Sequence, residues 1–159
     1  TIGKKLAQLL NMNFIDTDKE IEKSTGVSIN WLFDIEGEEG FRKREKDVLL
    51  EIKKTNSSVV STGAGLVLEK NNRELLASNG KVIYLDVSIE SQLKRTTFDK
   101  TRPLLSKGDK REILLKMSKD RDHLYKKLAD ITIKASKKSR KEIIEEIASK
   151  IKTIEDGPD

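Results

Sequence analysis

Two carboxylates lie two positions apart, at Asp16 and Asp18, directly after the short apolar run of Phe14 and Ile15. In an extended chain, residues two apart point to the same side, so both carboxylates could face one pocket. One could then hold a hydrated Mg²⁺ while the other accepts a proton from a hydroxyl group. The alternative is that the pair serves only to begin the next helix, with Asp18 at its start.

A second candidate pair is formed by Arg42 and Glu45, which are three residues apart in a predicted helix and can therefore contact each other. An arginine held by a glutamate presents a rigid fork to the carboxylate of a substrate. The alternative is a surface ion pair that contributes little to stability.

A run of small residues, Ser61-Thr62-Gly63-Ala64-Gly65, follows an apolar strand pattern. Small residues let backbone N–H groups approach an anion or a hydroxyl group closely. The alternative is an ordinary tight turn without a ligand.

Two further arginines could act on phosphate or carboxylate groups. Arg102, followed by Pro103, lies in the polar segment 97–109, which we interpret as a loop or lid. Arginines on a lid can neutralise the charge of a transferring phosphoryl group. Arg121 lies four residues before Tyr125 in a predicted helix. The alternatives are a solvated loop cation for Arg102 and the polar side of the helix for Arg121, and we expect the only histidine, His123, at the surface.

The elements that must position these residues alternate between strands and helices. This alternation favours a parallel sheet with helices on both faces, in which ligands bind at the carboxyl ends of the strands. We expect one domain over residues 1–154 and a frayed tail over 155–159. The predicted strands are 14–15, 58–62, 81–86 and 131–134, and the predicted helices are 2–10, 19–24, 29–33, 41–53, 69–77, 88–96, 110–128 and a last one capped by Ser139 and Glu142. The first helix has an apolar, inward face of Ile2, Leu6, Leu9 and Leu10, and we expect a break at Gly37.

Composition narrows the function classes. The net charge of +5 comes from interleaved signs, which indicates a solvated surface or attraction to anionic ligands such as nucleotides. Aromatic residues make up only 4% of the chain, which disfavours a nucleic-acid-binding protein. The absence of cysteine excludes disulfides and thiolate metal sites and is compatible with a reducing compartment. No apolar run approaches the ~18 residues of a membrane span.

Taken in order, these motifs resemble those of the shikimate kinase family from Thr1 to about Ile151. Segment 14–22 (FIDTDKEIE) resembles the family's D-x-D segment, and 37–45 (GEEGFRKRE) is similar to its G-E-x-x-F-R-x-x-E motif. The turn TGAG resembles the family's T-G-G-G. The strings RPLL, which begins at Arg102, and RDHLY, which begins at Arg121, match its R-P-L-L and R-x-x-x-Y motifs.

The resemblance implies an enzyme that transfers the γ-phosphate of ATP, with Mg²⁺, to the 3-hydroxyl group of shikimate in the pathway to chorismate and the aromatic amino acids. It also implies a three-layer P-loop kinase fold whose parallel sheet has the order 2-3-1-4-5. We expect a cytoplasmic monomer whose partners are shikimate and ATP, with neither nucleic acid nor a membrane.

The resemblance also assigns roles to the substrate residues. It implies that Asp18 binds the shikimate hydroxyl groups and accepts the proton, while Asp16 supports Mg²⁺ through water. Arg42 and Arg121 are implied to clamp the shikimate carboxylate, and Glu45 to orient Arg42.

Further implied contacts complete the two binding sites. Phe33 and Phe41 line the ring pocket. Residues Gly63, Ala64 and Gly65 offer backbone N–H groups to the substrate. On the nucleotide side, Arg102 is implied to reach the phosphates as a catalytic group, Arg95 and Lys138 to contact adenine, and Thr1 to end the phosphate loop.

The chain departs from the family pattern in two places. Ala64 replaces a glycine, which costs ~1 kcal/mol if its φ is positive and is nearly silent otherwise. Thr1 matches the last residue of the family's phosphate loop, so the lysine and serine before it are not in the printed sequence. We therefore expect this polypeptide to be inactive or nearly so, and we expect a gap where the first, central strand would lie, between 58–62 and 81–86.

Two alternatives to a shikimate kinase stay open at this stage. One is another small-molecule P-loop kinase, such as a gluconate kinase. The other is a non-catalytic module that binds shikimate or a protein partner.

Overall fold

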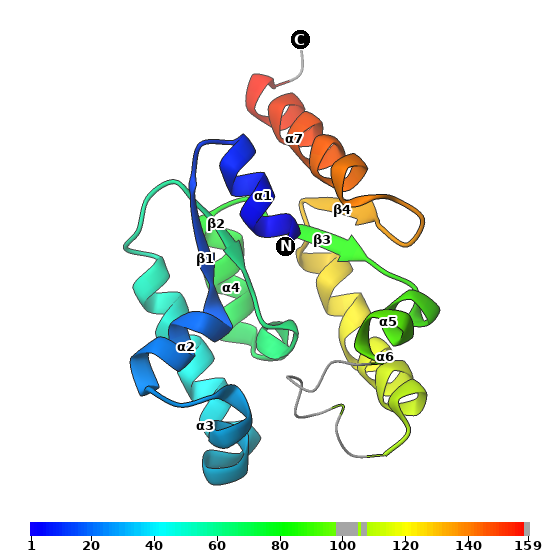
Figure 1. Cartoon of the computed structure of the whole chain (residues 1–159). Helices are drawn as coiled ribbons and strands as arrows, with labels where there is room; N and C mark the ends of the chain where they lie inside the picture. Colours follow the sequence, from blue (N-terminus) through cyan, green and yellow to red (C-terminus); the bar gives the residue numbers. More distant parts are fainter. Residues whose placement is uncertain (98–104, 106–107, 158–159) are drawn as a thin grey trace.

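The computed structural model describes residues 1–97, 105 and 108–157. Strands and helices alternate along the chain (Figure 1), as the apolar patterns predict. The elements are α1 (Ile2–Leu9), β1 (Asn13–Asp16), α2 (Thr17–Thr25), α3 (Ile29–Ile52), β2 (Ser58–Ser61), the 3₁₀ helix η1 (Ala64–Leu68), α4 (Lys70–Asn79), β3 (Ile83–Asp86), α5 (Ile89–Thr96), α6 (Lys110–Leu128), β4 (Ile131–Lys134) and α7 (Arg140–Asp156).

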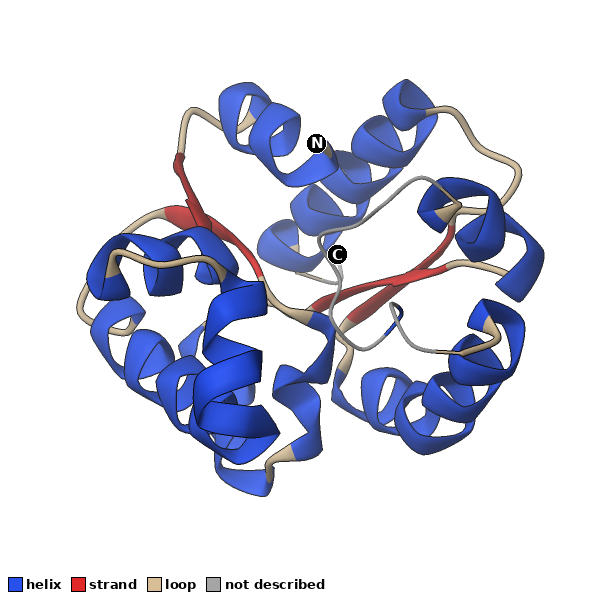
Figure 2. Ribbon diagram, turned by 60° about the horizontal axis from the view of Figure 1, so that its bottom comes forward, coloured by secondary structure: helices blue, strands red, loops and turns tan. Residues whose placement is uncertain are grey.

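The strands form two parallel pairs. β1 pairs with β2, in a register that places Asp16 opposite Ser61, and β3 pairs with β4. Helices lie on both sides of these strands (Figure 2), which confirms the predicted α/β class. Within the described residues, β2 and β3 are not hydrogen-bonded to each other. Direct pairing would have refuted the expected gap between them. That another strand belongs in this interval stays a prediction.

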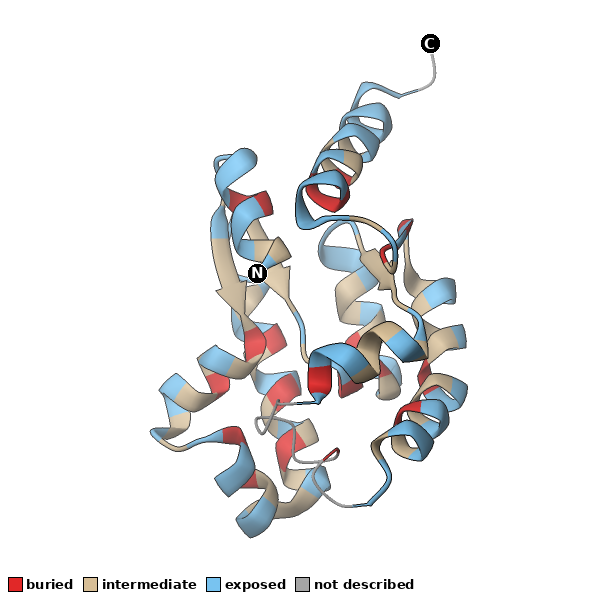
Figure 3. Ribbon diagram, turned by 45° about the vertical axis from the view of Figure 1, so that its right-hand side comes forward, coloured by how far each residue is buried: buried red, intermediate tan, exposed pale blue. Residues whose placement is uncertain are grey.

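The main apolar core joins the two strand pairs. Leu6 of α1 packs in the same cluster as Val59 of β2 and as Ile83 and Leu85 of β3. The buried positions lie on the inward sides of the surrounding helices (Figure 3). The buried members of this cluster are Leu6, Ile131, Ile133, Ala135, Ile143, Ile144 and Ile147.

A second, smaller core lies between α2 and α3. Its buried members are Ile21, Ile29, Leu32 and Phe41, and Phe33 packs against them. This cluster fixes the two helices that carry the first two candidate motifs.

Local sequence signals set most helix boundaries correctly. Ser139 and Glu142 form the predicted capping box at the start of α7. Gly37 has a φ of 71° and kinks α3 at the predicted break, although helical hydrogen bonding continues on both sides. One expectation is wrong: Leu9, expected inward, is 58% exposed. Helix α7 continues to Asp156, and the frayed tail over 155–159 stays a prediction.

The helices in residues 1–97, 105 and 108–157 include none with the length and apolar character needed to span a membrane.

Candidate active site

Asp16 and Asp18, at the carboxyl end of β1, have different surroundings. Asp16 is the N-cap of α2, and its Oδ1 accepts hydrogen bonds from the backbone N–H groups of Asp18 at 3.0 Å and Lys19 at 3.2 Å. The capping alternative therefore applies to Asp16, whereas Asp18 lies within the first turn of α2. Capping the helix uses one oxygen of Asp16 and leaves the Asp18 side chain to face the neighbouring strand's turn.

That turn, residues 63–65, is tied to the start of α2. The backbone N–H of Gly63 donates to Oγ1 of the fully buried Thr17 at 3.0 Å. A Cβ atom on Gly63 would lie 2.9 Å from Oδ1 of Asp18 and 2.9 Å from Oε1 of Glu45. The two carboxylates therefore flank Gly63, no farther apart than twice that distance, and a side chain there would displace them.

The guanidinium of Arg42 fills the space where a side chain at Gly65 would lie. A Cβ atom on Gly65 would lie 2.5 Å from Cζ and from Nη1 of Arg42, which is far inside normal contact. Ala64, between the two glycines, is exposed, and the only non-glycine residues with positive φ in the described part of the chain are Asn11 and Ser57. The alanine in place of the family's glycine is therefore conformationally nearly silent.

Arg42 and Glu45 form a buried ion pair, so the surface-pair alternative is wrong. Nη1 of Arg42 donates to Oε2 of Glu45 at 2.6 Å, and Nη2 donates to Oε1 of Glu38 at 3.1 Å. The exposed fractions of the Arg42 and Glu45 side chains are 11% and 1%. Glu45 and Glu38 fix the guanidinium plane, and the buried Nε of Arg42 has no hydrogen-bond partner among the described residues.

The electrostatics of this pair follow from its burial. Burial raises the pKa of the Glu45 carboxyl, the nearby negative charge of Asp18 adds to the rise, and Arg42 opposes both. Burial disfavours the charged form of Arg42, but hydrogen bonds and attraction from Glu45 and Glu38 outweigh it and raise the pKa of that group.

Aromatic rings form the wall next to the ion pair. The ring centroids of Phe33 and Phe41 lie 4.7 Å apart at an interplanar angle of 42°. The guanidinium of Arg42 lies over the Phe41 ring, 5.6 Å from its centroid. An apolar wall beside a charged fork suits a ligand that has both a ring and a carboxylate.

A second buried arginine reaches the same group from α6. Arg121 is only 8% exposed, so it does not lie on the polar side of its helix. Its positive charge opposes the rise in the pKa of the Glu45 carboxyl and acts on the Tyr125 hydroxyl, so it lies within electrostatic range of both groups. Arg121 of α6 is therefore near the site that Asp18 of α2 and the Arg42–Glu45 pair of α3 form.

Tyr125 also contacts the turn, although no role was predicted for it from the sequence. Its hydroxyl donates a hydrogen bond to the carbonyl of Ala64, and its ring stacks on Tyr84 with centroids 5.0 Å apart. The R-x-x-x-Y spacing placed it one helical turn from Arg121 and was the signal available for finding it.

The residues expected on the nucleotide side come from other elements of the fold. Thr1 is exposed at the N-cap of α1, and Arg95 is exposed in the last turn of α5. Lys138 forms an ion pair with Glu146 of α7. Arg102 and most of segment 97–109 lie outside the described residues. The surface position expected for His123 is confirmed.

A magnesium site would have to be assembled from few protein ligands. In the part of the chain that the structure describes, no three His, Cys, Asp or Glu residues cluster as a metal cage. Mg²⁺ usually keeps several waters and takes one or two carboxylates, so a hydrated ion needs no such cage. Asp16 fits this need, because the described hydrogen bonds use its Oδ1 and not its Oδ2.

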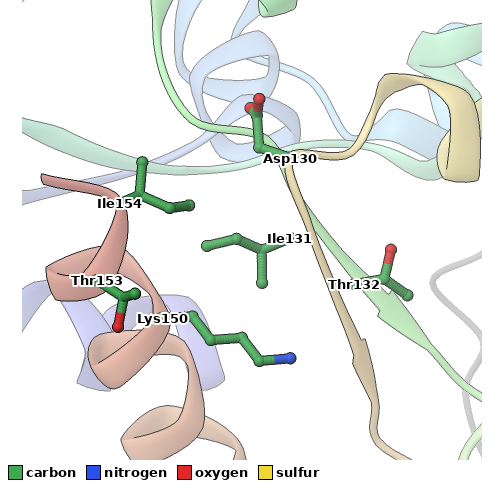
Figure 4. A pocket seen from close by; sticks show the side chains of 6 residues that line it. All are labelled: Asp130, Ile131, Thr132, Lys150, Thr153 and Ile154. Atoms are coloured by element: carbon green, nitrogen blue, oxygen red, sulfur yellow. The ribbon is translucent and has the colours of Figure 1, made fainter. Parts of the chain in front are cut away.

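A shallow hollow between β4 and the end of α7 is separate from these residues (Figure 4). It is lined by Ile131 and Thr132 of β4, the adjacent Asp130, and Lys150, Thr153 and Ile154 of α7. Its lining contains none of the candidate site residues, and Lys150 already pairs with Glu146.

Comparison with known proteins gives a consistent result. A family model described as "Shikimate kinase" matches residues 1–152. Shikimate kinases of Francisella philomiragia and of Francisella tularensis subsp. novicida are each 47% identical over 150 residues, which is 94% of this chain and 85% of theirs.

Solved structures agree with this similarity. A shikimate kinase from Acinetobacter baumannii in complex with shikimate superposes with a TM-score of 0.92 at 41% identity, covering 94% of this chain and 84% of that one. A shikimate kinase from Aquifex aeolicus superposes with a TM-score of 0.81 at 34% identity, covering 95% of this chain and 88% of that one.

Proposed function

The chain belongs to the shikimate kinase family, and we propose that its 63–65 turn is the floor of a shikimate site in which the 3-hydroxyl group receives the γ-phosphate of ATP. The observation that carries this proposal is the convergence of Asp18 and the Arg42–Glu45 pair on one turn, with the buried Arg121 in electrostatic range of Glu45. Two cationic groups beside an apolar wall complement a ring acid, and a neighbouring carboxylate complements its hydroxyl groups.

The arginines bind the substrate carboxylate. Arg42 is held in plane by Glu45 and Glu38, so its fork loses little freedom when a carboxylate binds. Arg121 approaches from a different helix, so the two guanidinium groups contact the carboxylate from separate directions. Positioning of this kind supplies much of the catalysis in phosphoryl transfer.

Asp18 is the proposed proton acceptor. The proton of the 3-hydroxyl group moves to its carboxylate, a bond forms between that oxygen and the γ-phosphorus, and the bond from phosphorus to the ADP oxygen breaks. The backbone N–H groups of residues 63–65 support the ring hydroxyl groups. The apolar surfaces of Phe33 and Phe41 exclude water from the ring.

The nucleotide contacts are proposed by resemblance to the family. Mg²⁺, when bound, neutralises charge on the phosphates, and Asp16 would hold it through water. Arg102 would reach the phosphates, and Thr1, at the N-terminus of α1, would lie beside them. Arg95 and Lys138 would flank adenine, Lys138 with its alkyl stem because its ammonium group pairs with Glu146.

We propose that this enzyme is a monomer that works in the cytoplasm. ATP is available in that compartment, and a chain without cysteine needs no oxidising environment to form disulfides.

A phosphotransfer assay with a panel of acceptors tests the proposal. The whole protein, with any upstream residues that its gene encodes, is incubated with Mg-ATP and either shikimate, quinate or gluconate, and the products are identified by ³¹P NMR. The proposal predicts phosphorylation of shikimate at the 3-position. Preference for gluconate would refute it, and shikimate binding without turnover would favour a non-catalytic module.

A further inference from the structure

We propose that Tyr125 is a positioning residue whose hydroxyl group holds Arg121 against the 63–65 turn and so sets the affinity of the site for the substrate carboxylate. This inference rests on the proposed function, because it assigns Arg121 to that carboxylate. Tyr125 itself need not contact the ligand.

The hydroxyl group of Tyr125 ties helix α6 to the turn. It donates to the carbonyl of Ala64, in the turn that Asp18 and Arg42 flank. Arg121 lies one helical turn before Tyr125 on the same helix and is only 8% exposed. Fixing Tyr125 against the turn therefore also fixes the part of α6 that carries Arg121.

The burial of the tyrosine fits this arrangement. Burial raises the pKa of the Tyr125 hydroxyl, while the positive charges of Arg121 and Arg42 oppose the rise. Both arginines proposed to bind the carboxylate therefore lie close enough to this hydroxyl to act on it. The nearby Asp122 carboxylate adds to the rise and is engaged by Ser118.

The position of Tyr125 in the fold explains why such a tether matters. Ala64 follows β2, whereas Tyr125 belongs to α6 and stacks on Tyr84 of β3. In the described residues, no strand-to-strand hydrogen bonds join β2 to β3. The Tyr125–Ala64 bond spans 61 positions in the sequence and connects the two parts of the site directly. Helix α6 also packs against η1, so the bond adds a directional contact that fixes how the Arg121 side of α6 meets the turn.

The stacked partner supplies a matched control. Tyr84 has the same ring and the same stacking, but its hydroxyl lies 3.5 Å from Asp122 and does not reach the turn. Tyr84→Phe and Tyr125→Phe therefore remove the same atom from the same pair of rings. Only the second change removes the hydrogen bond to Ala64.

Calorimetric titration of shikimate and of its methyl ester into the wild type and both variants tests the inference. Tyr125→Phe is expected to weaken shikimate binding about tenfold, the effect of one hydrogen bond that orients a charged group. Binding of the ester, which lacks the negative charge that Arg121 recognises, is expected to change less than about twofold, as is shikimate binding to Tyr84→Phe. Equal losses for acid and ester would indicate a merely structural role and overturn the inference.

A ligand-free measurement separates this inference from the proposed function. In ¹H–¹⁵N NMR spectra, Tyr125→Phe is expected to shift the Arg121 Nε–H and Gly65 amide signals, and Tyr84→Phe to leave them nearly unchanged. If the wild type fails to bind shikimate, the proposed function fails, and these shifts still decide whether Tyr125 holds Arg121. Unchanged signals in Tyr125→Phe would overturn the inference even if shikimate binds.

Discussion

Replacing Gly65 by alanine is expected to damage the site through one contact. The backbone at Gly65 is not in the left-handed region, so alanine meets no conformational penalty there. The new Cβ atom would lie 2.5 Å from Cζ and Nη1 of Arg42, whereas carbon atoms in contact are normally ~3.5–4.0 Å apart. The guanidinium must therefore move by about 1 Å or more.

Gly65→Ala is expected to lower both the free energy of unfolding and the affinity for shikimate. Overpacking of this kind costs ~1–3 kcal/mol of the free energy of unfolding. If Arg42 moves far enough to break its pair with Glu45, a buried carboxylate loses its partner, and the cost rises to ~3–5 kcal/mol. Shikimate affinity is expected to fall ~10- to 100-fold, because a hydrogen-bonded charged contact contributes ~1.5–3 kcal/mol.

Urea unfolding and calorimetric titration of Gly65→Ala measure both effects. Gly80→Ala is the control, because its backbone is extended and no heavy atom lies within 4 Å of the new Cβ atom. The control is expected to change stability by less than ~1 kcal/mol and to leave shikimate affinity unchanged. A Gly65→Ala protein that binds shikimate like the wild type would contradict the placement of Arg42 against the turn.

Two further predictions concern stability. The pKa of Glu45 is raised above its ordinary value of 4.5, so the folded state binds this proton more tightly than the unfolded state. The free energy of unfolding of the wild type should therefore fall, relative to Glu45→Gln, as the pH rises from about 4.5 through the folded pKa. An opposite slope in urea titrations at several pH values would show that Arg42 outweighs burial. Ser139→Ala removes the α7 cap and should cost ~1 kcal/mol without altering shikimate affinity, and a loss of affinity would connect α7 to the site.

Much of the scaffold could be predicted from sequence because its signals are local. Strand β4 and helix α6 have the predicted limits, and the capping box at Ser139 is read directly from residue types. Leu9 shows the limit of periodicity, which identifies a helix face but not where the covering elements end. The break expected at Gly37 is a kink, where non-helical backbone angles separate two helical parts of α3.

The site could be predicted only in part, because its geometry is long-range. The order of Asp18, Arg42 and Arg121 followed from resemblance to a family. Their burial and their meeting at one turn depend on side chains from different helices. The contact of Tyr125 with Ala64 leaves no trace in local sequence patterns, since it joins residues 61 positions apart.

A crystal structure with bound shikimate tests the central claim most directly. We predict that the shikimate carboxylate lies ~2.7–2.9 Å from guanidinium nitrogens of both Arg42 and Arg121. We also predict that the 3-hydroxyl group of shikimate lies within hydrogen-bond distance of Asp18. A carboxylate bound away from either arginine, or a 3-hydroxyl group that does not face Asp18, would contradict the account.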